Sequence, residues 1–146
     1  KEEYLGVVEL DQYKYIHQYD LGNSIAYKTR LDYLIKEQKQ CVKDKEAIYD
    51  NGISEKATIR DITKLMIRCF NSDCENIISK VKYNNVEASA NKIKKSAEDI
   101  NKLANRFDFA ITPTYINLKI EELYLKYEYE CKLQEEKEQQ EQKLFY

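Results

Sequence analysis

The near-absence of helix-breaking residues constrains this fold most, because the chain has three glycines and one proline among 146 residues. All-β and doubly wound α/β folds need many more turn residues between their elements. Charged residues make up 34 % of the chain, well above the usual share. A chain of this length suits one domain with its own core. The sequence therefore predicts a mainly α domain with long helices and few loops.

Apolar residues recurring every three or four positions predict about four helices. The first helix is expected over residues 25–49, followed by the stop signal Asp50-Asn51-Gly52. A second helix is expected from Ser54 or Glu55. The polar run Tyr83-Asn84-Asn85 interrupts it and supplies the cap of a third helix, although a single kinked helix would also fit.

The third helix has the most regular apolar pattern, with steps of four and three residues. Its members are Val86, Ala90, Ile93, Ala97, Ile100, Ala104 and Phe107. This spacing predicts a narrow packing seam in which the alanines allow close helix approach. Thr112 and Pro113 are then expected to open a fourth helix, as its N-cap and its first residue.

The fourth helix is expected to have two parts. An apolar stripe in its first half can pack on the core: Ile116, Ile120, Leu123 and Tyr127. Beyond Lys132 the sequence favours a helix but offers almost nothing to bury, so a helix reaching Leu144 would be about 48 Å long and would project. We therefore divide the chain into an extended or short β N-terminal segment (1–24), a helical core domain (25–131) and a charged helical arm or linker (132–146).

Charge is unevenly distributed, although the formal net charge is only −2. Residues 56–95 hold nine basic and four acidic side chains, whereas residues 121–142 hold eight acidic and three basic ones. These runs are either solvated helix faces or, in the basic region, a surface for an acidic partner or a phosphate backbone. The candidate recognition surface comprises Arg68, Asn71, Lys80, Lys82, Tyr83, Asn85, Lys92 and Lys95. Arg68 and Asn71 also fit a buried hydrogen-bond network that fixes helix register.

Tyrosine is abundant, with 13 residues, three of which crowd the fourth helix. A tyrosine buries an apolar ring and keeps a polar tip, so it suits wet cores and protein interfaces alike. Core packing is the simpler interpretation. The functional alternative is a protein interface made by Tyr124, Tyr127 and Tyr129.

We identify no catalytic residues, no metal ligands and no cofactor site, and we expect no enzymatic activity. The single histidine, His17, stands among aromatic residues without a nucleophile or an acid to mark it as a base. The sequence contains no phosphate-binding loop, nucleophile elbow or zinc motif. The four cysteines lie on or beside apolar stripes, so we interpret them as small buried hydrophobes in a reducing compartment.

The sequence has no apolar run of membrane-spanning length and no signal peptide. The first residue is Lys1 rather than methionine, so we expect the chain to be a piece of a longer protein. We expect a cytoplasmic location, with membrane association only through a segment outside this chain.

Four ordered motifs resemble a coiled-coil-containing domain family of unknown function that precedes GIY-YIG endonuclease domains in phage and bacterial proteins. They are Phe70-Asn71-x-x-Cys74, the run from Lys80 to Val86, Ile100-Asn101-Lys102-Leu103, and the stretch from Tyr115 to Leu123. The resemblance covers about residues 15–140. One departure is Ser72-Asp73, where the family pattern has Gly-Glu. No Gly-Ile-Tyr or Tyr-Ile-Gly triplet is present, so the resemblance implies a helper domain in phage defence and transfers no catalytic residue.

Two functions remain open. The first is a non-catalytic interaction or positioning module of a nuclease-linked protein, which would bind a protein partner or self-associate. The second is a nucleic-acid-binding module that presents DNA to a linked GIY-YIG nuclease. The tyrosines, the seam and the arm favour the first, and the basic region favours the second.

Overall fold

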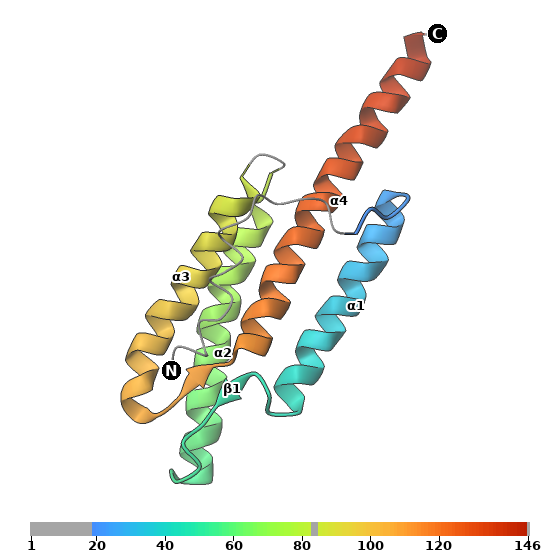
Figure 1. The fold of residues 1–146 in the computed structure, drawn as a ribbon. Coiled ribbons are helices and arrows are strands. Elements are labelled where there is room, and N and C mark those ends of the chain that lie inside the picture. The colour runs from blue at the N-terminus through green and yellow to red at the C-terminus, as the bar shows by residue number, and fades with distance from the viewer. Residues whose placement is uncertain (1–18, 83–84, 146) are drawn as a thin grey trace.

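Four long helices carry the fold in the computed structural model, which describes residues 19–82 and 85–145 (Figure 1). The helices are α1 (Ser24–Lys43), α2 (Lys56–Ser79), α3 (Val86–Ala104) and α4 (Pro113–Phe145). A short 3₁₀ helix, η2 (Asn105–Phe107), follows α3, and two short strands, β1 (Ile48–Tyr49) and β2 (Ala110–Ile111), form one antiparallel pair. The predicted mainly α class, with four helices and a long C-terminal helix, is confirmed. The N-terminal segment expected at 1–24 lies mostly outside the described residues, as does His17.

The first helix ends six residues earlier than predicted. A Schellman motif stops it: the N–H of Glu46 donates to the Cys41 carbonyl at 3.0 Å, and that of Lys45 to the Val42 carbonyl at 3.1 Å. Lys45 takes the left-handed conformation, with φ of 62°, that glycine usually provides at this position. Ile48 and Tyr49, expected in the helix, therefore form β1 instead.

The two strands tie the middle of the chain to the start of α4. Ile48 faces Ile111, and Tyr49 faces Ala110. The next residue, Thr112, caps α4 as predicted, since its hydroxyl oxygen accepts the N–H of Tyr115 at 3.3 Å. The same hydroxyl lies 2.7 Å from the Glu46 carbonyl, to which it donates. The strand pair and the cap thus fix the chain after α1 against the first turn of α4.

The helix α4 is the centre of the packing. It lies beside α1 on one side and beside α3 and α2 on the other, while α2 packs along α3 (Figure 1). One core cluster joins α2, α3, α4, the strands and Cys41 at the end of α1, and a smaller one, around Tyr27, Leu34 and Leu125, joins α1 to α4. By contrast, α1 and α2 do not pack along each other. The four helices therefore leave one side of α4 open between α1 and α2.

The predicted seam of α3 packs over most of its length. Val86, Ala90, Ile93 and Ala97 are buried. Phe107 is the exception, with 65 % of its surface exposed. Since η2 tightens the turn after Ala104, the helical spacing is lost before residue 107. Phe109, which is fully buried two residues later, fills the core at this end instead.

Beyond Lys132, α4 continues past the other helices, as Figure 1 shows at the C-terminal end. Most side chains over residues 133–144 are exposed. Glu136 is an exception: it accepts the Ser24 hydroxyl at 2.7 Å and the Ser24 N–H at 3.0 Å. These hydrogen bonds hold the pKa of Glu136 below its usual value and place a carboxylate at the positive end of α1. Contact with α1 therefore extends four residues past the start of the predicted arm.

The prediction that every cysteine is buried is wrong for Cys69. Cys41 and Cys74 are buried and Cys131 is half-buried, but Cys69 is exposed. The neighbouring Phe70 points into the core, and one helical residue turns the side-chain direction by about 100°. Cys69 therefore points away from the apolar stripe of α2.

We expect Cys69 to be the one fast-reacting thiol of the folded chain at pH 8. Burial raises the pKa of the Cys74 thiol to about 12 and also raises the pKa values of Cys41 and Cys131. A raised pKa lowers the fraction of reactive thiolate at a given pH, so these three should react at least about tenfold more slowly. Labelling with an aromatic disulfide, followed by absorbance, measures the phases. The variant Cys69→Ser should lose the fast phase, and a fast phase that persists would contradict the burial pattern.

Candidate functional site

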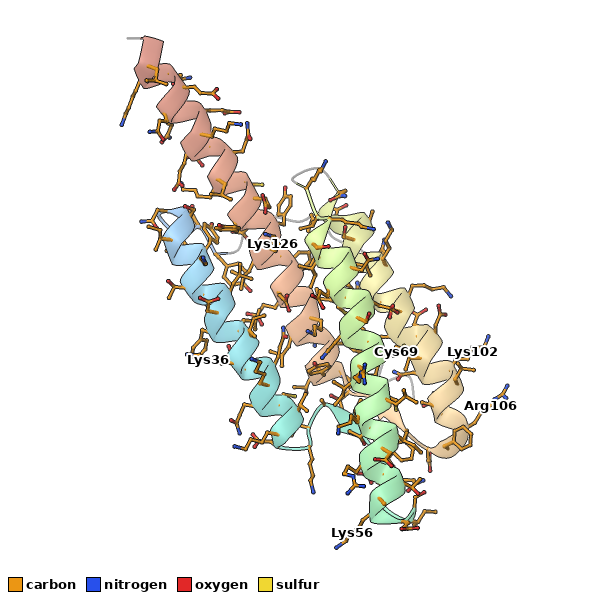
Figure 2. The ribbon with its side chains drawn as sticks, turned by 180° about the vertical axis from the view of Figure 1, so that it is seen from behind. Lys36, Lys56, Cys69, Lys102, Arg106 and Lys126 are labelled. Carbon is orange, nitrogen blue, oxygen red and sulfur yellow. The ribbon has the colours of Figure 1, made fainter. Side chains whose placement is uncertain are left out.

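A long depression, here called the α1–α2 groove, lies between α1 and α2. It consists of two hollows of about 490 and 690 Å³. Val42 of α1 and Ile67 of α2 line both hollows, so the two hollows adjoin. Figure 2 is seen from this side, with α4 visible behind the space between α1 and α2. The groove exists because α1 packs on α4 and not on α2.

The larger hollow has an apolar floor. Its apolar lining residues come from α1, the α1–β1 loop, β1 and α2: Val42, Ala47, Ile48, Ile59 and Ile67. Ala47 and Ile48 are also members of the main core cluster, so this floor is the outer surface of the core. Ala47 and Ile48 are themselves buried, so the apolar surface that another molecule could cover here comes from the half-buried Val42, Ile59 and Ile67.

Basic side chains surround this floor. They are Lys43, Lys45, Lys56, Arg60, Lys64 and Arg68, and all are exposed. Asp50 is the one acidic residue that lines the same hollow. Arg60 also makes an exposed ion pair with Asp61, with Nε 3.4 Å from Oδ1, which is worth little in water. The larger hollow therefore combines an apolar floor with a strongly positive rim.

The smaller hollow has a polar floor built from α1 and α4. The Lys119 ammonium donates to Gln38 Oε1 at 2.9 Å, and the Gln38 amide donates to Glu122 Oε1 at 2.8 Å. Lys119 Nζ also lies 3.6 Å from Glu122 Oε1. Gln38 and Lys119 are buried, with 4 % and 9 % of their surface exposed. This network holds α1 on α4 at the base of the groove.

Asn71 and Tyr115 connect α2 to the same floor. The Tyr115 hydroxyl donates to Asn71 Oδ1 at 2.6 Å. Burial raises the pKa of Tyr115 to about 12, and the hydrogen bond to Asn71 opposes that rise in part. The Lys119 ammonium also lies 5.7 Å from the centre of the Tyr115 ring. The groove thus has a polar, well-bonded end and an apolar end with a basic rim.

The structure distributes the predicted recognition residues over three places. Arg68 and Asn71 line the groove, in different hollows. Lys80, Lys82 and Asn85 lie where α2 ends and α3 begins, and the Asn85 side-chain oxygen accepts the Lys82 N–H at 2.8 Å.

The other predicted residues lie on α3, where Lys92 and Lys95 are exposed and Lys95 pairs with Asp99 at 2.8 Å. Tyr83 is outside the described residues. The bond from Tyr115 fits the alternative interpretation of Asn71, as part of a hydrogen-bond network.

The predicted tyrosine interface lies mainly against the domain. Tyr124 belongs to the main core and is 9 % exposed, and Tyr127 packs on the same cluster. Tyr129 packs on the smaller cluster, and the Lys126 ammonium lies 5.1 Å from its ring centre. Their use by a partner stays a prediction, with Tyr127 and Tyr129 retaining part of their surface.

Five basic residues of the rim were missing from the predicted surface: Lys43, Lys45, Lys56, Arg60 and Lys64. A signal for three of them was present, because Lys56, Arg60, Lys64 and Arg68 recur every four residues. Residues four apart lie on one helix face, so this stripe was predictable. Lys43 and Lys45 join it only through the turn after α1.

Within residues 19–82 and 85–145, the structure shows no group of three or more His, Cys, Asp and Glu side chains placed to hold a metal ion. Over the same residues, no helix has both the length and the apolar character needed to cross a membrane.

Comparison with known proteins supplies one match. No curated protein and no solved structure matches the chain. Residues 24–134 match the family described as the SNIPE-associated domain, and this range begins at the first residue of α1 and contains every residue that lines the groove. Since the match covers well over half of the sequence, the chain belongs to the SNIPE-associated domain family.

Proposed function

We propose that this chain is a non-catalytic accessory module of a nuclease-linked protein, and that it binds and positions a protein partner. Two arguments support the nuclease link: membership of the SNIPE-associated domain family and the motifs that resemble domains preceding GIY-YIG endonucleases. On this proposal the setting is defence against phage. Residues 132–146 then serve as an arm that joins the helical core to the linked nuclease.

The observation that carries the binding role is the α1–α2 groove. A helical domain of this size normally covers its core with its own elements, and soluble monomers rarely expose large apolar areas. Here Val42, Ile59 and Ile67 stay half-buried in a hollow between α2 and the end of α1, with a basic rim around them. An apolar centre with a charged border is the usual anatomy of a protein-binding surface.

Site-specific photo-crosslinking tests the binding role in cells. A photoreactive phenylalanine analogue is placed singly at Lys64 in the groove, at Lys92 on α3 and at Tyr129 on α4, within the protein in its natural context. All three positions are partly or fully exposed, so the fold should tolerate the replacement. We expect a discrete protein adduct from at least one position. The absence of any protein adduct from all three positions would contradict the proposal.

A second candidate function, nucleic-acid binding, is favoured by the stripe Lys56, Arg60, Lys64 and Arg68. Phosphate contacts by such a stripe should give a DNA shift that weakens steeply as salt rises from 50 to 200 mM (about tenfold or more for a few contacts). Electrophoresis of the chain with duplex and single-stranded DNA measures this. No shift at the lowest salt would exclude a DNA-presenting role for this chain.

A further inference from the structure

We infer that the α1–α2 groove binds an acidic, amphipathic α-helix of a partner protein. This inference rests on the proposed binding function and goes further by assigning the surface, the conformation and the charge of the occupant. The apolar face of the partner helix would cover the half-buried Val42, Ile59 and Ile67, and its acidic flanks would face the basic rim.

The walls of the groove decide the conformation of the occupant. One wall is the helix α2 along the whole groove, and the other is α1 in the smaller hollow and the end of α1, the turn after it and β1 in the larger hollow. The backbone polar groups of the two helices are already bonded within each helix, and β1 is paired with β2. An extended peptide in the groove would leave many of its own N–H and C=O groups without partners over an apolar floor, which is costly. A helix pairs its backbone N–H and C=O groups internally and presents only side chains to the groove. Helical occupancy is therefore the favoured mode for this groove.

The length of the groove sets the size of the occupant. The lining residues of α2 run from Lys56 to Glu75, a rise of about 28 Å. A helix of about 19 residues, or five turns, spans that distance. Such a helix would lie along α2, with only one end over Tyr115 and Lys119 of α4, and its apolar residues would be spaced three and four apart.

Charge decides the chemistry of the flanks. Six basic side chains and one acidic side chain line the larger hollow. A basic or neutral helix placed there would add repulsion or leave the rim unpaired, whereas Glu or Asp on both flanks would pair with it and speed association. Complementary charge of this kind mainly sets specificity and the rate of association. The apolar floor supplies the surface that is buried when the helix binds.

Two other occupants fit less well. A nucleic acid would pair with the rim through hydrated phosphates and leave Val42, Ile59 and Ile67 partly exposed. The arm of a second copy of this chain is acidic, but over residues 133–144 its apolar residues are Leu133 and Leu144 alone, three turns apart. That arm cannot cover an apolar floor several turns long. A partner helix with a continuous apolar stripe can.

A designed peptide tests the inference directly against the full 146-residue chain. The probe is a fluorescein-labelled 20-residue helix with a leucine stripe flanked by glutamates. One matched probe replaces every glutamate by lysine, and another replaces every leucine by glutamine. By fluorescence anisotropy we expect the acidic amphipathic probe to bind at least about tenfold more tightly than either matched probe. Only this probe can both bury leucines on the apolar floor and pair glutamates with the basic rim.

Charge reversal then locates the site. The variant Arg60→Glu/Lys64→Glu should weaken binding of the acidic probe at least about tenfold, since it removes two positive charges from the rim and adds two negative ones. The control Lys92→Glu/Lys102→Glu makes the same charge change on exposed residues of α3 and should change binding less than about threefold. Circular dichroism checks that both variants keep their helix content.

Several results would overturn the inference. These are no binding of the acidic probe, equal binding of the lysine probe, equal loss in both double variants, or complete displacement of the probe by duplex DNA. The crosslinking experiment separates this failure from that of the proposed function. Adducts from Lys92 or Tyr129 without one from Lys64 would mean that the chain binds a partner that does not use the groove. No adduct from any of the three positions would contradict both the proposed function and this inference.

Discussion

Replacing Asn101 with alanine is expected to lower the free energy of unfolding by about 2–5 kcal/mol. The Asn101 side chain is buried, with 4 % of its surface exposed. Its Oδ1 accepts the Ile111 N–H at 2.8 Å, and its Nδ2 donates to the Ile111 carbonyl at 3.3 Å. Alanine leaves both backbone groups of Ile111 buried without a partner, and each such group costs about 1–3 kcal/mol.

This effect reaches the groove through the strand pair. One edge of β2 pairs with β1, and the Asn101 amide completes the other edge as a neighbouring strand would. Since Ile48 of β1 faces Ile111 and lines the larger hollow, Asn101 supports the groove floor from behind. We therefore expect Asn101→Ala to weaken binding of the acidic probe as well as stability.

Chemical denaturation followed by circular dichroism measures the stability change, with a fall in melting temperature on the order of 10 °C as a second readout. The matched control is Asn117→Ala on the exposed side of α4, which should change stability by less than about 1 kcal/mol and in the stabilising direction. Equal changes in the free energy of unfolding for the two alanine variants would contradict the stabilising role of the Asn101 hydrogen bonds.

Most of the helical framework could be predicted from the sequence because it depends on local signals. The scarcity of Gly and Pro, the 4-3 seam of α3 and the Thr112-Pro113 start of α4 each act within a few residues. These signals gave the fold class, the number of helices and the start of α4. The end of α1 was predicted wrongly because Lys45 occupies a left-handed position that carries no glycine to mark it.

The strand pair depends on contacts that no local pattern encodes. Ile48 and Tyr49 continue the apolar run of α1, and they become a strand only because Ala110 and Ile111 lie beside them. A run of two residues is too short for a period-two pattern. The partner of this strand is about sixty residues away in sequence, so its position depends on how α2 and α3 bring the chain back.

The groove was beyond sequence reasoning for a related physical reason. An apolar stripe shows that a helix is covered on one face, but it does not show which helix covers it. The stripe of α1 is satisfied by α4, and that of α2 by α3 and α4. The sequence indicated that Arg68 and Asn71 belong to a polar cluster on α2. That cluster lines a groove only because α1 and α2 do not pack along each other, which the sequence does not show.

Gln38 illustrates how a polar residue in an apolar stripe should be interpreted. In the sequence it interrupts the stripe of the first helix. In the structure it is buried and bonds to both Lys119 and Glu122 of α4. Its amide also lies 3.2 Å from the Leu118 carbonyl, to which it donates. The interruption therefore marks a specific polar contact between two helices.

Replacing Lys119 with methionine is expected to cost about 3 kcal/mol of unfolding free energy. The change removes the ammonium that lies 3.6 Å from Glu122 Oε1, in a side chain that is 16 % exposed, and it leaves Gln38 Oε1 without the donor Lys119 Nζ. A largely buried carboxylate that loses its cation destabilises the fold, whereas replacing the whole set of polar groups by well-packed apolar side chains is often neutral. The triple variant Gln38→Leu/Lys119→Met/Glu122→Leu should therefore recover most of the stability lost in the single variant.

Denaturation of the single and triple variants, together with Lys126→Met as the matched control, separates a specific network from the simple loss of a lysine. Lys126 of the same helix is half-exposed and pairs with Glu130 at 2.8 Å, so its replacement should cost less than about 1 kcal/mol. A triple variant as unstable as Lys119→Met would contradict the network account. If the triple variant recovers its stability but no longer binds the acidic probe, the polar floor serves recognition in the groove rather than the stability of the helix pair.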